Sequence, residues 1–283
     1  MAAVQNVLAI DVGATKIQWA VIKNGKIIEK EKMKTLEKMD NKKLANLVIA
    51  IASKTKPNRA GISLPGFVKN GKILQLPNLP NVKNMEIEKE LKRKLKIPVF
   101  AQNDVKCMAI ALLNEKNACN SFIVVAPGSG IGGAIVIDGK IVLGKQNCAG
   151  EFGHMKIIFE GKGRGTKIFE WEQICGGKGI EKKYFEKTRK RKSAKEIFSS
   201  HKKIEKNICK NAAYYFGIGL ANIANALNPQ KIIITGSVGK AYLAKYKKTV
   251  LDAFEKNAIE PVRKTKIEKC RMENPALAGA AML

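Results

Sequence analysis

Two glycine-rich stretches with polar side chains are the first candidates for chemistry. The earlier one, DVGATK from Asp11 to Lys16, lies between two β-rich runs. Phosphate binds exposed backbone N–H groups in tight turns, and Gly13 allows that close approach. Thr15 and Lys16 add a hydroxyl and a cation, while Asp11 at a strand end suits Mg²⁺ held through water. An ordinary polar hairpin turn is the alternative interpretation.

The later stretch, APGSGIGG at 126–133, also lies between strands and has four glycines in its last six residues. Such a stretch fills a core poorly, which favours a backbone that approaches a ligand, although a structural bulge remains the alternative. A second strand follows it, whereas a dinucleotide-binding fingerprint would open a helix. No Gly-Lys-Ser/Thr follows either, which excludes a Walker P-loop.

Three further polar residues stand out beside these stretches. Asn103-Asp104 follows a short predicted strand and opens a predicted helix. Asp104 could accept the proton of an attacking hydroxyl, and either residue could instead be an N-cap. In the loop AGEFGHM, Glu151 and His154 are flanked by glycines, which favours a polar binding loop over a purely structural histidine. His201 lies in a lysine-rich helical segment and is assigned no role.

The elements that position these residues repeat along the chain. Strands are predicted at 7–12, 17–22, 26–32, 60–63 and 99–101, and helices at 40–55, 84–96 and 104–114. A second round has strands at 122–127, 132–144 and 231–237, and helices within 178–226, 240–258 and 275–283. The sequence therefore predicts an α/β protein with duplicated β-β-β-α-β-α units, each with one glycine-rich turn.

Composition restricts the class of protein. The 283 residues are 45% hydrophobic and 27% charged, as in ordinary globular proteins. Six cysteines lack paired spacing, which indicates reduced thiols. No apolar run approaches the roughly 20 residues that span a bilayer, and the first ten residues lack the charged start of a signal peptide. We expect a cytoplasmic protein that does not bind membranes.

The formal net charge of +28 is the unusual feature of the composition. Clustered Lys and Arg would suit nucleic acid or an anionic membrane. Here the basic residues are spread over many segments with acids between them, and only 187–195 is close to a run of one sign. This pattern favours a lysine-rich solvated surface, and no specific nucleic-acid partner is expected.

Taken together, these segments resemble the ROK family of sugar kinases and repressors, within the actin-like ATPase superfamily that includes hexokinases. The matching stretches are IDVGATKIQWAVI, GISLPGFVKNGKILQLPNLP, Asn103-Asp104, APGSGIGGAIVIDGKIVLG, CAGEFGHM, NIANALNPQKIIITGSV and ALAGAAML. The resemblance implies a two-lobed, ribonuclease H-like fold with an interlobe cleft. One lobe would be 1–118 completed by a helix at 270–283, and the other 119–269.

The resemblance also implies a role for each matching position. Asp104 would be the catalytic base, and Asp11 would organise Mg²⁺. The ATP-binding set would be Gly13, Thr15, Lys16, Gly128, Ser129, Gly130, Gly236 and Ser237, with the last two at the adenosine. The sugar-binding set would be Gly66, Asn78, Asn103, Glu151, His154 and Glu172. The partners implied are ATP, a hexose substrate and a second copy of the chain in a homodimer.

The segment after His154 departs from the family pattern. Many members hold a zinc ion there with that histidine and three clustered cysteines. Residues 156–174 of this chain contain no cysteine, and Cys175 stands alone. Because tetrahedral zinc needs four ligands, no structural zinc is expected.

Three function classes share these features. The first is ATP-dependent phosphorylation of a hexose or hexose derivative, glucose by default and at the 6-hydroxyl. The second is a sugar-sensing ROK-type regulator, disfavoured because Asp11 lies too early for a preceding helix-turn-helix. The third is a non-catalytic sugar-binding protein, disfavoured because Asp11, Asp104 and both glycine-rich stretches are intact.

Overall fold

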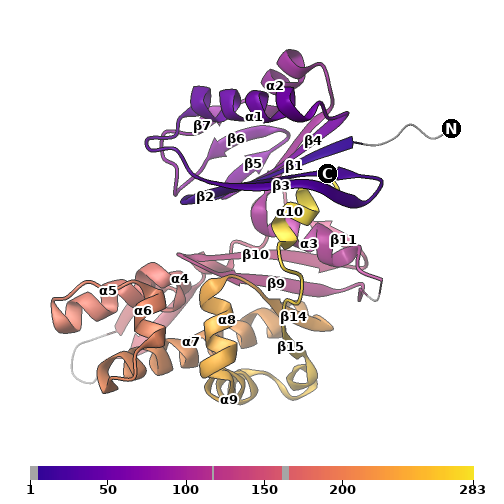
Figure 1. Cartoon of the computed structure of the whole chain (residues 1–283). Coiled ribbons are helices and arrows are strands. Elements are labelled where there is room, and N and C mark those ends of the chain that lie inside the picture. The colour runs from indigo at the N-terminus through magenta and orange to yellow at the C-terminus, as the bar shows by residue number, and fades with distance from the viewer. Residues whose placement is uncertain (1–5, 117, 161–165) are drawn as a thin grey trace. The chain divides into compact units, whose positions relative to one another are not determined.

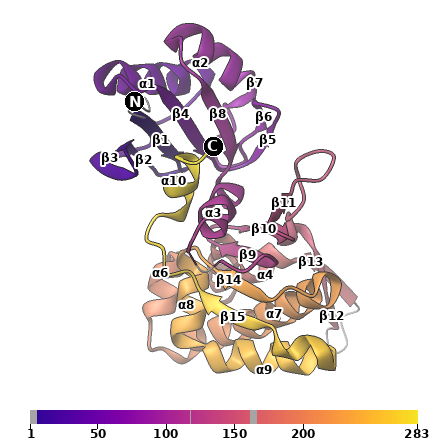
Figure 2. The ribbon, with the colours of Figure 1, turned by 90° about the vertical axis from the view of Figure 1, so that its right-hand side faces the viewer.

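The computed structural model describes residues 6–116, 118–160 and 166–283 (Figures 1 and 2). The chain forms two compact α/β units. Unit 1 comprises Met1–Ala118, Leu143–Cys148 and Met272–Leu283, and unit 2 comprises Cys119–Val142 and Ala149–Arg271. Within the described ranges, no helix has the length and apolar character that crossing a membrane would require.

Unit 1 contains a five-stranded mixed sheet in the order β3-β2-β1-β4-β8. Its strands are β1 (Asn6–Val12), β2 (Lys16–Lys23), β3 (Lys26–Lys34), β4 (Arg59–Leu64) and β8 (Val99–Asn103). The first three are antiparallel neighbours, and β4 and β8 continue the sheet parallel to β1. This arrangement brings the carboxyl ends of β1, β4 and β8 to the same edge of the sheet.

Helices cover both faces of this sheet. Because side chains alternate along a strand, Leu8 and Ile10 pack with α1 (Asn41–Thr55) and α2 (Ile87–Leu95), and Ala9 packs with α10 (Pro275–Ala280). A Cβ on Gly61 of β4 would overlap the carbonyl oxygen of Ala280, so α10 lies directly on the strand backbone. The α3 helix (Asp104–Leu113) packs against α10.

A small antiparallel sheet completes unit 1. It consists of β5 (Phe67–Lys69), β6 (Lys72–Gln75) and β7 (Lys83–Met85). Its last strand occupies residues that the helix prediction for 84–96 had included, and α2 begins only at Ile87. That prediction was wrong at its start because Lys83–Met85 pair with β6.

The main sheet of unit 2 repeats that of unit 1, in the order β11-β10-β9-β14-β15. Its strands are β9 (Phe122–Pro127), β10 (Ile131–Ile137), β11 (Lys140–Val142), β14 (Lys231–Ile234) and β15 (Lys266–Lys269). As in unit 1, the first three are antiparallel neighbours and the last two are parallel to the first. The duplicated plan and the α/β fold class are confirmed.

Helices and one hairpin complete unit 2. The helices are α4 (Trp171–Cys175), α5 (Gly177–Thr188), α6 (Ala194–Ser199), α7 (Lys203–Leu227), α8 (Ser237–Lys245) and α9 (Lys247–Asn257), and β12 (Lys156–Glu160) pairs with β13 (Thr166–Glu170). Two short 3₁₀ turns lie at Phe152–His154 and Glu260–Lys264. The long helical segment predicted at 178–226 is thus three helices, since α5 ends at Arg189 in the left-handed conformation.

An aromatic stack forms the centre of the core of unit 2. The Phe216 ring stacks on Trp171 at 5.3 Å and on Tyr242 at 4.8 Å between centroids. The Trp171 indole donates to the carbonyl of Tyr215 at 3.0 Å, and the Tyr242 hydroxyl donates to that of Cys175 at 2.8 Å. This stack fixes α4, and with it the residues on either side of Trp171.

Candidate functional site

The turn between β1 and β2 is tight and exposes its polar residues. The Gly13 N–H donates to the carbonyl of Lys16 at 2.8 Å, and a Cβ on Gly13 would lie 2.7 Å from that oxygen. The Thr35 hydroxyl donates to the Gly13 carbonyl at 2.7 Å and braces the turn. Thr15 and Lys16 are exposed. The turn therefore requires glycine and presents a hydroxyl and a cation to solvent.

Asp11, at the end of β1, is held by neutral donors from both neighbouring strands. Sheet register places Gln18 of β2 and Ser63 of β4 opposite Asp11. The Ser63 hydroxyl donates to Asp11 Oδ1 at 2.8 Å, and the Gln18 amide donates to Oδ2 at 3.3 Å. Burial raises the pKa of Asp11 against the opposing effects of these two donors and of the Lys16 charge.

Asn103 and Asp104 join β8 to α3 at the same edge of the sheet. Asn103 Oδ1 caps α3 by accepting from the N–H groups of Val105 at 3.0 Å and Lys106 at 3.1 Å. Asp104 is the first residue of the helix, where a negative charge interacts favourably with the helix dipole. Asn103 is therefore the N-cap, and Asp104 Oδ1 also accepts from the Val105 N–H at 2.9 Å.

The pKa of the buried Cys107 thiol depends on the charges around it. Burial raises its pKa well above the usual value, and the negative charges of Asp104 and Asp11 raise it further. Both carboxylates thus act on one thiol group of unit 1, as expected for residues at the same edge of the sheet.

Two more predicted residues, Gly66 and Asn78, belong to unit 1. Gly66 accepts a hydrogen bond at its carbonyl from Asn103 Nδ2 at 3.1 Å. A Cβ on Gly66 would lie 2.5 Å from the Gln75 carbonyl oxygen, so a side chain has no room there. Asn78 lies half-buried in the turn between β6 and β7. The structure therefore joins Gly66 directly to Asn103.

In unit 2, the loop between β9 and β10 is tied to the start of α5. The Gly128 N–H donates to the Gly130 carbonyl at 2.9 Å. The first N–H groups of α5, those of Gly177 and Lys178, donate to the carbonyls of Gly128 and Ser129 at 2.8 and 2.9 Å. Ser129 itself is exposed. The loop is thus held in one conformation by backbone hydrogen bonds.

Glu172 is bonded to this same loop. Its Oε2 accepts from the backbone N–H of Ile131 at 3.0 Å. A Cβ on Gly130 would overlap that carboxylate, and one on Gly153 would approach it to 3.0 Å. Glu172 is therefore next to both the predicted phosphate loop and the segment that contains His154.

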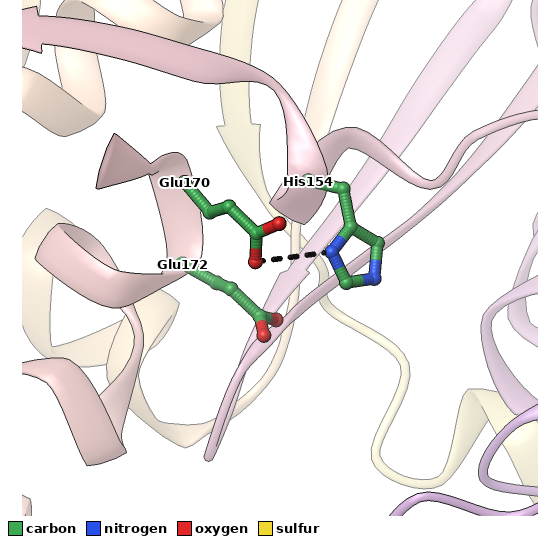
Figure 3. Close-up of side chains that lie close together, drawn as sticks. All are labelled: His154, Glu170 and Glu172. Atoms are coloured by element: carbon green, nitrogen blue, oxygen red, sulfur yellow. Dashed lines mark hydrogen bonds and ion pairs between the residues drawn. The ribbon is translucent and has the colours of Figure 1, made fainter. Parts of the chain in front are cut away.

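Figure 3 shows His154, Glu170 and Glu172 facing one another. The His154 Nδ1 lies 3.2 Å from Glu170 Oε2, and the Lys156 ammonium lies 2.8 Å from Glu170 Oε1. These contacts, first with Lys156 and then with His154, lower the pKa of Glu170. Glu151, half-buried, precedes the 3₁₀ turn that ends at His154.

These residues do not fit a structural zinc ion. One ligand atom each from His154, Glu170 and Glu172 lies within 4.8 Å of the others, which is a possible metal cluster. Tetrahedral structural zinc, however, is bound by four ligands, usually with several cysteines, and residues 156–174 have none. The ammonium of Lys156 also occupies one carboxylate oxygen of Glu170.

Gly236 and Ser237 lie between β14 and α8. Gly236 has a φ of 70°, and a Cβ there would overlap the carbonyl oxygen of Pro127. This turn therefore packs on the end of β9 and requires glycine, while Ser237 is exposed.

Sequence reasoning did not find Gln18, Ser63, Lys156 and Glu170. Gln18 and Ser63 are buried polar residues inside apolar strands, and that mismatch was the available signal. Glu170 and Lys156 become neighbours only through the register of the β12–β13 hairpin, which no local pattern indicates.

Comparison with known proteins places the whole chain among sugar-related proteins. The model of the ROK family matches residues 7–283. A glucokinase from Halalkalibacterium halodurans is 30% identical over 268 residues, covering 83% of this chain and 81% of that protein. A xylose repressor from Bacillus spizizenii is 31% identical over 188 residues, covering 63% of this chain and 48% of the repressor.

Solved structures share the fold. The ROK hexokinase from Thermus thermophilus matches with a TM-score of 0.83 at 23% identity, covering 98% of this chain and 97% of that one. A ROK family glucokinase from Streptomyces griseus, in complex with glucose and AMPPNP, matches with a TM-score of 0.75 at 21% identity, covering 98% of each chain.

Proposed function

Since this chain belongs to the ROK family, we propose that it transfers the γ-phosphoryl group of ATP to a hydroxyl of a hexose or hexose derivative. The observation that carries the proposal is the set of polar residues at the strand ends of unit 1. Asp11 is held by Ser63 and Gln18 beside a glycine turn, and Asp104 opens α3 at the same edge of the sheet. A protein that only binds sugar has no need of this pair of carboxylates.

Asp104 is the base of the proposed reaction. The substrate hydroxyl oxygen forms a bond to the γ-phosphorus, the bond from that phosphorus to the β,γ-bridging oxygen breaks, and ADP leaves. Asp104 takes up the proton that the hydroxyl loses. Its place at the start of α3 puts the carboxylate at the positive end of the helix dipole.

Asp11 fits the requirements of a magnesium ion. Mg²⁺ prefers oxygen ligands and is commonly held by one or two carboxylates together with substrate phosphates. When bound, it would neutralise negative charge on the phosphoryl oxygens. Asp11 would hold this ion through water, and Ser63 and Gln18 would fix the orientation of the carboxylate.

Backbone turns bind the nucleotide in this proposal. Gly13, Thr15 and Lys16 of unit 1, and Gly128, Ser129 and Gly130 of unit 2, contact phosphate, and Gly236 and Ser237 contact the adenosine. What supports these roles is that the first turn is closed by the Gly13–Lys16 hydrogen bond and the last excludes any side chain at Gly236. The complex of the Streptomyces griseus relative with AMPPNP is consistent with a nucleotide.

A set of polar groups binds the sugar in this proposal. The proposed set is Gly66, Asn78, Asn103, Glu151, His154 and Glu172. Carboxylates and an imidazole suit vicinal hydroxyls, which both donate and accept hydrogen bonds. Glucose, phosphorylated at its 6-hydroxyl, is the first candidate because of the glucokinase relative and the glucose-bound structure. A cytoplasmic homodimer is part of the same proposal.

A sugar-sensing regulator is the second candidate, because a xylose repressor matches 63% of the chain. A regulator would need the sugar-binding residues and not the strand-end carboxylates of unit 1. The two functions therefore differ in what they predict for ATP.

A coupled phosphorylation screen tests the proposal. Purified protein would be incubated with Mg²⁺, ATP and each of glucose, fructose, mannose, allose, N-acetylglucosamine and N-acetylmannosamine. We expect at least one sugar to give ADP and sugar phosphate in equal amounts, detected enzymatically and by mass spectrometry. Calorimetric binding of a sugar without phosphorylation of any would instead support the regulator.

A further inference from the structure

Glu170 links the firmly packed start of α4 to the exposed side chains of His154 and Lys156. It is the last residue of β13 and the N-cap of α4, and its backbone N–H donates to Gln173 Oε1 at 3.1 Å. The next residue, Trp171, is fully buried in the aromatic stack. The Glu170 carboxylate therefore extends from a fixed backbone position.

The two partners of Glu170 are less constrained. The side chains of His154 and Lys156 are 52% and 59% exposed, against 26% for Glu170. Hairpin register places Lys156 directly opposite Glu170, and His154 lies two residues before Lys156. Lys156 is bonded to Oε1 and His154 Nδ1 to Oε2, and the Glu170 side chain also accepts from the backbone N–H of Gln173 in a capping box. Glu170 thus binds both exposed side chains through separate oxygens.

We propose that Glu170 is a positioning residue for sugar binding, which holds the His154 ring with its Nδ1–H directed at the carboxylate and its Nε2 turned toward substrate hydroxyls. Figure 3 shows the Nε2 on the side of the ring away from Glu170. Lys156 balances the charge of Glu170 and keeps it aligned. This proposal rests on the proposed function, because the hydroxyls belong to the sugar.

The same geometry offers a way to hold the His154 ring without a metal ion. An imidazole is fixed as well by a carboxylate on one nitrogen as by a ligand bond, and the carboxylate sets which tautomer is present. A cation bound at His154 Nδ1 would replace the Nδ1–H that faces Glu170 Oε2. That hydrogen bond and a metal bond at Nδ1 therefore exclude each other.

Nitrogen-15 NMR of the imidazoles tests this arrangement without any substrate. The chain has two histidines, so exposed His201 serves as an internal reference. At about pH 8.5, where an ordinary imidazole is neutral, we expect the Nδ1–H tautomer to predominate in His154 and not in His201. Glu170→Gln and Lys156→Met should both shift the His154 signals toward those of His201. The same tautomer pattern at both histidines in the unmodified protein would overturn the proposal.

Sugar kinetics supply the second readout, with the sugar that the phosphorylation screen identifies. We expect Glu170→Gln to raise the KM for that sugar about tenfold, with a smaller change in kcat and none in the KM for ATP. Glu186→Gln and Lys183→Met are matched controls, because Lys183 and Glu186 form an exposed ion pair 3.3 Å apart on α5. Both controls should stay within twofold of the unmodified protein.

Unchanged sugar KM in Glu170→Gln, or one zinc per chain by elemental analysis, would also overturn the proposal. Lys156→Met guards against a folding defect in Glu170→Gln, because it leaves the N-cap of α4 intact. The two hypotheses can fail separately. Phosphorylation of a sugar without the His154 tautomer contradicts only the role of Glu170, and the tautomer without phosphorylation of any sugar contradicts only the kinase.

Discussion

A carboxylate in each unit is withdrawn from water, Asp11 in unit 1 and Glu205 in unit 2, and the pKa values of the two shift in opposite directions. In unit 1, Asp11 is bonded by the neutral donors Ser63 and Gln18, and burial raises its pKa. In unit 2, Glu205 of α7 is buried 2.8 Å from the ammonium of Lys192, a contact that lowers its pKa. Neutral donors leave Asp11 short of positive charge, whereas Lys192 supplies a cation to Glu205 Oε1 within its own unit.

This difference separates a carboxylate suited to function from one suited to structure. A raised folded pKa means that the folded state binds the proton more tightly, so ionised Asp11 costs stability at neutral pH and the cost fades as pH falls. A lowered folded pKa means that Glu205 contributes stability above the ordinary carboxyl pKa, which is lost as pH falls through the lowered value. Asp11 would gain from an external cation, and Glu205 would not.

The largest expected effect comes from Asp11→Asn. We expect kcat/KM for MgATP to fall by about 10²-fold or more, because the carboxylate charge is lost. The melting temperature should stay the same or rise. The new amide can donate to Gln18 Oε1, which is buried without a partner among the described side chains, after the Gln18 amide flips.

Steady-state kinetics and thermal unfolding of the same preparation measure both quantities. A large drop in melting temperature with activity retained would contradict the functional role of Asp11 and show that it is structural, as proposed for Glu205.

A smaller effect, on stability alone, is expected from Lys192→Met. The change leaves the Glu205 carboxylate buried without its cation, so the melting temperature should fall by several degrees at neutral pH. The deficit should shrink as pH falls from the ordinary carboxyl range through the lowered pKa of Glu205, because the unmodified protein then loses the ion pair as well. Lys183→Met, which removes an exposed partner, is the control and should melt like the unmodified protein. If kcat fell as well, Glu205 would not be purely structural.

The smallest effect is expected from Ser63→Ala. Removing the hydroxyl that donates to Asp11 Oδ1 should raise the pKa of Asp11 further, since that bond favours the charged form. The acid limb of the pH dependence of kcat/KM for MgATP should move to higher pH, with little change above neutrality. Ser193→Ala, which removes the N-cap of α6, should leave the limb in place. If the acid limb did not move in Ser63→Ala, protonation of Asp11 would not be what controls kcat/KM for MgATP.

The sequence could predict the parts of the fold that local patterns specify. The hairpin signals Asn24-Gly25 and Asp138-Gly139 adopt left-handed backbone in the structure and join the β2–β3 and β10–β11 pairs. Strand β15 was missed because KIEK is mostly charged and lies at the edge of its sheet. Helix 84–96 was begun too early because the pairing of β7 with β6 is not local.

The same limit applies to the candidate site. Asp11, Gly13 and Asp104 could be selected because a turn or a strand end is visible in a few consecutive residues. Their supporting residues could not, because Ser63 meets Asp11 through pairing of strands 52 positions apart. Glu170 and Lys156 meet through hairpin register. The sequence therefore identifies candidate reactive residues more easily than it identifies the residues that hold them in place.

The most direct test of the kinase is the turnover of Asp104→Asn with the best sugar from the screen. The substitution removes the base and leaves the N-cap Asn103 in place. We predict that kcat falls by about 10²-fold or more, while the calorimetric affinity for the sugar stays within a few-fold. Near-normal turnover by Asp104→Asn would contradict the account, because proton transfer would then not depend on this carboxylate.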